Sequence, residues 1–270
     1  MKSKGAKNLL LAAALVSTIG SRAMAQDVAT IETQAANSDV VLSSDPVITA
    51  ILSQPGTVNG HTYTGYSFLA QDSSGSLDFF YSTTASSYVP VVGNAISVSS
   101  GNFSPFDGIP EVANSAANPL SISTVSTGNP VLAPTTVTIP QINVTSLTAN
   151  NIINTPYAGY YVQLNDVTIS GAPATFPNST ASYTITDGSN NSMVWFFWES
   201  SYSTDGAMIG TSIPTGPVDM DGFVDYFANS SEAEFVATSI TPVPEPAPIA
   251  LGAISSILSG LFFYRVRKTA

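Results

Sequence analysis

Hydrophobic residues in the central part of the chain occur in short runs, each bounded by glycine, proline, asparagine, aspartate or serine. Runs such as 47–52, 95–98 and 161–164 are rich in β-branched residues and have the length of strands. No stretch between 46 and 241 repeats its hydrophobic positions every 3.6 residues over a useful length. The pattern therefore predicts an all-β body, built as a barrel or a sandwich.

A hairpin pattern occurs twice in this body. Segments 66–81 and 183–198 each read as a strand, an aspartate-led turn and an aromatic strand. Two β modules, 46–127 and 146–241, fit this repetition better than one continuous sandwich. Three later residues also recur at identical spacing, since Gly101, Phe106 and Glu111 match Gly222, Phe227 and Glu232.

The two hairpins, QDSSGSLDFFY and TDGSNNSMVWFFW, and the segment GFVDYF before a closing strand resemble small OB-fold-like domains of secreted bacterial proteins. The resemblance implies two small OB-like barrels. We expect the proline-rich segment 128–145 to join them as an extended linker. Residues 26–45 are polar and without pattern, which predicts a flexible lead-in to the first module.

The N-terminus has the three parts of a secretory signal peptide. Three lysines precede the apolar run 9–19, and Ala23 and Ala25 form an Ala-x-Ala site before Gln26. Signal peptidase is therefore expected to remove residues 1–25 and leave Gln26 at the start of the exported chain. A short buried helix is the alternative interpretation.

The C-terminal segment 243–268 has an equally ordered composition. Its uncharged stretch, 247–264, is just long enough to cross a bilayer as a helix. The positive-inside rule keeps the basic end in the cytoplasm and places the preceding body outside. The motif in 243–248 contains Val243, Pro244, Glu245 and Pro246, and the basic end contains Arg265, Arg267 and Lys268.

The order of motif, membrane helix and basic end resembles the PEP-CTERM sorting signal, with Pro244-Glu245-Pro246 as its motif. The resemblance implies recognition by a membrane-embedded exosortase, with cleavage near the motif. It also implies a sorted cell-surface or extracellular protein, of a kind associated with exopolysaccharide and biofilms. An ordinary C-terminal membrane anchor that is never cleaved is the alternative.

Charge is distributed unevenly along the 270 residues. The formal net charge is −11, yet all seven lysines and arginines lie at the ends, and none lies between Gln26 and Tyr264. Nucleic-acid binding depends chiefly on cations that neutralise phosphates, so this composition argues against it. The chain has no cysteine and one histidine, His61, in a turn-like segment, which excludes disulfides and multi-histidine metal sites.

One cluster of carboxylates stands out in the second module. Asp219, Asp221 and Asp225 share parity, so they would face the same side of a regular strand. Such oxygen ligands suit Ca²⁺, the one cofactor that the sequence suggests. A solvated strand face in an acidic protein is the alternative.

An aromatic strand is the second candidate site. Alternation places Trp195 on one face and Phe196 and Trp198 on the other. One face belongs to the core, and the other would offer a flat platform for sugar rings. Cover by neighbouring loops or by the partner module is the alternative.

These observations predict an exported, non-enzymatic surface or extracellular-matrix protein, since no nucleophile motif is recognisable. Its expected partners are signal peptidase, exosortase and exopolysaccharide, and its contact with the membrane is the C-terminal helix. A carbohydrate-binding module that uses the aromatic strand is the second hypothesis. A carboxylate-based hydrolase is the third.

Overall fold

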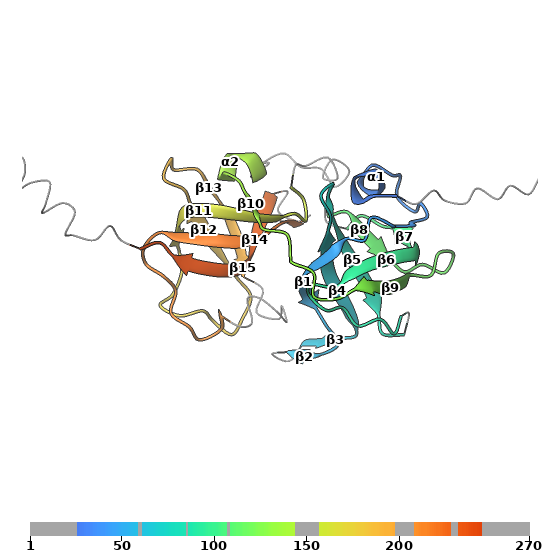
Figure 1. Ribbon diagram of the computed structural model, residues 1–270. Coiled ribbons are helices and arrows are strands. Elements are labelled where there is room, and N and C mark those ends of the chain that lie inside the picture. The colour runs from blue at the N-terminus through green and yellow to red at the C-terminus, as the bar shows by residue number, and fades with distance from the viewer. Residues whose placement is uncertain are drawn as a thin grey trace, which may run out of the picture.

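The protein consists mainly of β-strands, which form two lobes side by side in the computed structural model (Figure 1). This confirms the expected all-β character of the body. The predicted signal peptide, 1–25, and the predicted membrane helix, 247–264, lie outside the described residues. Among the described residues, no helix has the length and apolar character needed to cross a membrane. The structure describes residues 26–58, 61–84, 86–106, 109–143, 157–197, 208–227 and 232–244.

The second module is a closed five-stranded barrel. Its strands are hydrogen-bonded in the order β11-β12-β13-β15-β14, and β14 pairs again with β11. The β13–β15 pairing is parallel and the other four are antiparallel, an arrangement typical of OB-like barrels. The strands are β11 (Tyr161–Ser170), β12 (Ala181–Thr186), β13 (Ser192–Phe197), β14 (Val218–Phe227) and β15 (Glu232–Pro242).

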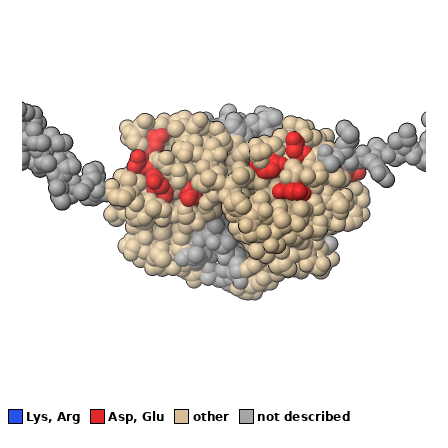
Figure 2. All heavy atoms as spheres, in the orientation of Figure 1, with Lys and Arg blue, Asp and Glu red and all other residues tan. Residues whose placement is uncertain are grey.

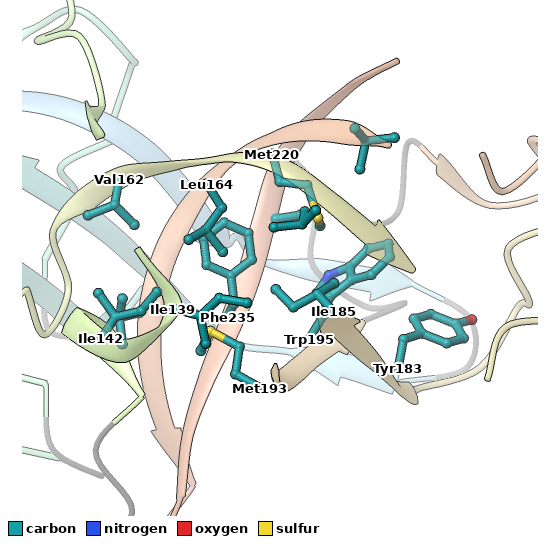
Figure 3. Packing of buried hydrophobic residues seen from close by; sticks show 14 of the residues in the cluster. Ile139, Ile142, Val162, Leu164, Tyr183, Ile185, Met193, Trp195, Met220 and Phe235 are labelled. Atoms are coloured by element: carbon teal, nitrogen blue, oxygen red, sulfur yellow. The ribbon is translucent and has the colours of Figure 1, made fainter. Parts of the chain in front are cut away.

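Aromatic side chains fill this barrel because alternate residues of each strand point inward. Trp195 and Phe197 are fully buried, and the ring of Phe176 stacks on Phe197 with centroids 5.2 Å apart. Figure 3 shows Trp195 between strands, with Ile185 of β12 and Met220 of β14 directed toward it. Burial of large aromatic rings provides much of the hydrophobic stabilisation of such a small barrel.

The first module is a curled seven-stranded sheet, a half-barrel with the order β7-β8-β5-β4-β1-β6-β9. Strands β6 and β7 follow each other in the chain and are separated by Gly101. Strand β6 pairs with β1, and β7 pairs with β8. A small hairpin of β2 (Gly56–Val58) and β3 (His61–Tyr63) follows β1. The sheet consists of β1 (Val47–Ser53), β4 (Gly65–Gln71), β5 (Ser76–Ser82), β6 (Ala95–Ser100), β7 (Asn102–Phe103), β8 (Glu111–Ala113) and β9 (Ser121–Ser126).

The structure reproduces the internal repeat in its pairings. The β4–β5 hairpin corresponds to β12–β13, and the parallel pair β5–β8 corresponds to β13–β15. Register places Gly101 and Gly222 at equivalent positions, as their spacing predicted. The structural equivalent of Glu111, however, is Glu234 and not Glu232, because the connection into β15 is two residues longer.

Both hairpins turn around an aspartate side chain. The Asp72 carboxylate accepts hydrogen bonds from the backbone N–H groups of Ser74 (2.7 Å) and of the glycine that follows. The Asp187 carboxylate accepts from the backbone N–H groups of Ser189 and Asn191, both at 2.9 Å. The aspartate at the start of each turn is therefore what closes it, as the sequence pattern indicated.

The prediction of a flexible lead-in is wrong. Residues from Gln26 onward fold onto the first module and include α1 (Val28–Glu32), which Asp27 caps by accepting a hydrogen bond from the Thr30 N–H. Val28 and Ile31 of this helix are fully buried in the core of the module. Val40 and Leu42 of this segment are buried in the core as well. The mainly polar composition gave no indication of these four core positions.

The predicted linker also needs correction. Its second half contains β10 (Thr135–Thr136), which pairs with β11, and α2 (Ile139–Ile142). Val137, Ile139 and Ile142 are buried in the core of the second barrel. Proline is tolerated in the first turn of a helix, so Pro140 does not prevent α2 from forming. The second module therefore begins within the segment that composition assigned to the linker.

We expect Gly222→Ala to destabilise the second barrel by about 1–3 kcal/mol, because an added Cβ would clash with the Val236 carbonyl oxygen and lie 2.6 Å from the Phe235 ring. The matched control is Gly188→Ala in the β12–β13 turn, where nothing lies within 4 Å of the new methyl group. Urea denaturation of both variants tests this. Equal stability of the two variants would contradict the close packing inferred at Gly222.

Candidate functional site

OB-like barrels usually bind ligands on the outward face of their second and third strands, which in the first module are β4 and β5. Their inward residues, such as Phe68, Phe79 and Tyr81, fill the core. Most of the outward residues are nevertheless buried although many are polar, and Phe80 near the end of β5 is the exception at 49% exposed. Ser67, Gln71, Ser76 and Asp78 are all less than 10% exposed.

The second module covers this face. The Ser76 hydroxyl donates to the Gly159 carbonyl at 2.7 Å, and the Tyr161 N–H donates to Oε1 of Gln71 at 3.3 Å. The Tyr160 hydroxyl donates to the Ser74 carbonyl in the β4–β5 turn at 3.0 Å. The chain that enters β11 therefore satisfies polar groups of the first module.

An apolar cluster completes the contact. Leu69 on β4 is 1% exposed, and Phe223 on β14 is 2% exposed. Phe196 on β13 packs against the cluster from the second module. The two barrels thus share a small hydrophobic core, which holds them in one orientation. The buried members are Ala50, Leu52 and Leu69 from the first module and Phe223 and Val236 from the second.

Two carboxylates lie on the covered face of the first module. Asp78 of β5 and Glu111 of β8 are opposite each other in the parallel register, and they are 7% and 8% exposed. Burial raises the pKa of Asp78 to about 7, although the Ser67 hydroxyl donates to this carboxylate at 3.0 Å. The sequence pattern did not predict this pair. The one feature of the sequence that could have indicated it is that each of the two acidic residues has hydrophobic neighbours in the chain.

A second acidic group lies where α1 meets the β4–β5 turn. The Glu32 carboxylate accepts a hydrogen bond from the Ser76 N–H at 3.0 Å, and burial raises its pKa to about 7. Burial and the nearby charges of Glu32 and Asp72 raise the pKa of Tyr160 to about 12. Tyr160 therefore remains a hydrogen-bond donor at all physiological pH values, as its contact with the turn requires.

The equivalent strands of the second module, β12 and β13, are only partly covered, since Phe196 on β13 packs against the cluster between the modules. Ser182 and Thr184 on β12 are exposed, as are Thr168 and Ser170 on β11. The Thr168 and Ser170 hydroxyls donate to backbone carbonyls of β12, both at 3.3 Å. This surface, called here the hydroxyl face, consists of β11 and β12 with their outward Ser and Thr side chains. Its four named side chains are exposed and uncharged.

The aromatic strand does not form the expected platform. Trp195 is fully buried in the barrel core, so no sugar ring could stack on it. Phe196 faces the opposite side, as predicted, but packs against the cluster between the modules. Trp198 lies outside the described residues. Alternation along the strand was predicted correctly, whereas the cover over its outer face depends on where the first module docks.

The three aspartates of β14 lie on its outward side, but they do not converge. The Asp219 carboxylate accepts from the Asp166 N–H at 3.0 Å, and Asp221 accepts from the Gln163 amide and the Ser239 hydroxyl, both at 2.9 Å. Phe223 lies between Asp221 and Asp225 on the strand and is buried between the modules. Within the described ranges, no three His, Cys, Asp or Glu side chains are placed to hold a metal ion. The Ca²⁺ site stays a sequence prediction.

Most of the predicted processing residues lie outside the described residues: Ala23, Ala25, Glu245, Pro246, Arg265, Arg267 and Lys268. Gln26 is described, and its N–H donates to the Val41 carbonyl at 3.0 Å. At the other end, the Val243 N–H donates to the Pro217 carbonyl at 3.0 Å, and Pro244 follows directly. The folded body therefore reaches both predicted processing sites.

Comparisons with known proteins add little. No family model matches the chain, and no curated protein matches it. Among solved structures, it is similar to a chain of a replication protein A heterotrimer bound to single-stranded DNA, with 10% identity and a TM-score of 0.23. That similarity covers 86% of this chain and 72% of the other. A TM-score this low supports no conclusion about fold or function. The description of the modules as OB-like therefore rests on their strand pairings.

Stability should depend on pH through the buried carboxylates. The folded-state pKa values of Asp78 and Glu32 are raised to about 7, so the folded protein keeps protons that the unfolded chain releases above about pH 4. The free energy of unfolding should therefore fall as the pH rises from about 4 to about 7, and level off above that. Denaturation series across this range test the direction.

Asp78→Asn isolates one contribution. The amide cannot ionise, so this variant should exceed the wild type by about 1–3 kcal/mol at about pH 8 and match it near pH 4. Asp187→Asn is the control, because Asn191 and backbone hydrogen bonds hold the pKa of Asp187 below its usual range. That variant should lose stability at about pH 8. A gain for both variants would show that general charge reduction, and not burial of Asp78, is responsible.

Proposed function

We propose that this chain is an exported, non-enzymatic surface or extracellular-matrix protein that a PEP-CTERM/exosortase-type system sorts. In this proposal, two OB-like modules form the exported body between a signal peptide and a C-terminal sorting helix. The sorting part rests on the sequence of the two ends: a signal peptide with its Ala-x-Ala site, and the motif, apolar stretch and basic end of the tail.

One observation carries the structural part of the proposal. The face on which OB-like barrels usually hold ligands is, in the first module, buried under the second module through Ser76, Gln71 and Leu69. A module whose ligand face binds its neighbour serves to build a larger rigid body. The carboxylates of Asp78 and Glu111 are buried on the same face of the first module, where a polymeric substrate could not reach them.

The charge distribution fits export to a polysaccharide-rich surface. The body has no lysine or arginine between Gln26 and Tyr264, so no internal cation competes with the basic end as a stop signal in the membrane. The same feature argues against a role in nucleic-acid binding. A strongly acidic body also stays soluble through self-repulsion.

The test of sorting measures the intact mass and the membrane association of the full chain, produced with and without an exosortase. We expect loss of the segment after about Val243 only when the enzyme is present. Pro246→Ala should block this cleavage, whereas Pro248→Ala, outside the Pro-Glu-Pro motif, should not. An uncut, membrane-bound chain under both conditions would make this protein a plain anchored surface protein.

Carbohydrate binding is the second candidate, and the exposed hydroxyl face of the second module favours it. OB-like barrels bind oligosaccharides on the face of their second and third strands, and Thr184 lies near the middle of the second strand, β12, with an exposed side chain. Affinity gels with bacterial exopolysaccharides test the idea. Thr184→Asp should abolish retardation, while Ser99→Asp, at an exposed position of the first module, should leave it unchanged. No retardation of the wild type by any polysaccharide would reject this candidate.

A further inference from the structure

Strand β9 lies at the end of the seven-stranded sheet of the first module. It pairs with β6 on one side, and no strand of the described residues lies on its other side. Five of its six residues are exposed. An end strand of this kind presents a row of backbone N–H and C=O groups to solvent, which can pair with the edge of another strand.

Exposed hydrophobic side chains gather beside this strand. Two hydrogen bonds join the loop before β6 to the segment after β9: both the backbone N–H and the side-chain amide of Asn129 donate to the Gly93 carbonyl, at 2.8 and 3.0 Å. These neighbouring segments and β9 itself hold six of the eight large hydrophobic residues that are exposed in the described part of the chain: Val89, Val91, Val92, Val125, Val131 and Leu132.

The same region carries no charge. Residues 79–106 and 112–165 contain no aspartate, glutamate, lysine, arginine or histidine, although the chain has a net charge of −11. The acidic side chains visible in Figure 2 form small separate groups, with wide uncharged areas between them. Strand β9 also lacks the lysine and proline residues that usually protect an exposed edge from pairing. Two copies of this acidic protein could therefore approach along β9 without repulsion between their charges.

We propose that β9 is an interface between two copies of this chain, which pair antiparallel about a two-fold axis near Ser123. The pairing would place Ser123 beside itself and Ile122 beside Thr124 of the other copy, so that two half-barrels share one continuous sheet. A two-fold contact uses the same surface on both copies, which suits an uncharged strand of serine, threonine and β-branched residues. The valine clusters beside β9 would add hydrophobic contact at the edges of the pairing.

Cysteine cross-linking tests this directly, because the natural chain contains no cysteine. Full-length chains with the single substitutions Ser121→Cys, Ser123→Cys and Val125→Cys are purified and oxidised with copper phenanthroline. We expect a covalent dimer of twice the chain mass, strongest at Ser123 and weaker on either side. Ser182→Cys and Thr184→Cys on the exposed strand β12 are the controls, and should remain monomeric.

A second variant separates pairing from chance collision. Ser121→Lys in the Ser123→Cys chain places like charges beside the axis and should reduce the dimer at least tenfold, while thermal unfolding stays unchanged. Three results would overturn the proposal: no dimer at any β9 position, equal dimer at β12, or an adduct whose mass shows a different protein as partner. None of these results depends on whether the sorting signal is cleaved.

Discussion

The docking of the second module onto the outward face of β4 and β5 is the contact on which the rest of the molecule depends. Leu69 and Phe223 meet in a shared apolar cluster, and Ser76 and Gln71 find hydrogen-bond partners in the chain that enters β11. Without this cover, polar and apolar groups of the first module would face solvent together. Because these contacts lie on two separate barrels, they turn two small modules into one body whose stability is shared.

This contact also determines how the two repeated modules differ in the surfaces that they expose. Equivalent hairpins turn around Asp72 and Asp187, and equivalent glycines lie at 101 and 222. Yet the outward face of β4 and β5 is largely buried, whereas the hydroxyl face on β11 and β12 is exposed. A repeat that is nearly symmetrical in its strand pairings thus becomes asymmetrical in its exposed surfaces, since one module supplies the surface that covers the other.

Carboxylate burial is the constraint that this arrangement imposes on an acidic chain. Asp78 lies in the covered face in a body that contains no lysine or arginine, so protonation is the simplest way to relieve the cost of burial. The raised pKa of Glu32 beside the same turn has the same physical origin. Stability and pH are therefore linked through the part of the structure that joins the modules.

The sequence by itself determined the strand-rich body, the aspartate-led hairpins and the equivalence of Gly101 and Gly222, because each depends on residues close together in the chain. It did not reveal that residues 26–45 and the second half of 128–145 belong to the cores, since Val28 and Ile139 show their role only once a barrel is present to receive them. The candidate site depended still more on tertiary structure. The loss of Trp195 as a platform, the burial of Asp78 and the exposure of β9 follow from how distant strands pack, and no local pattern carries that information.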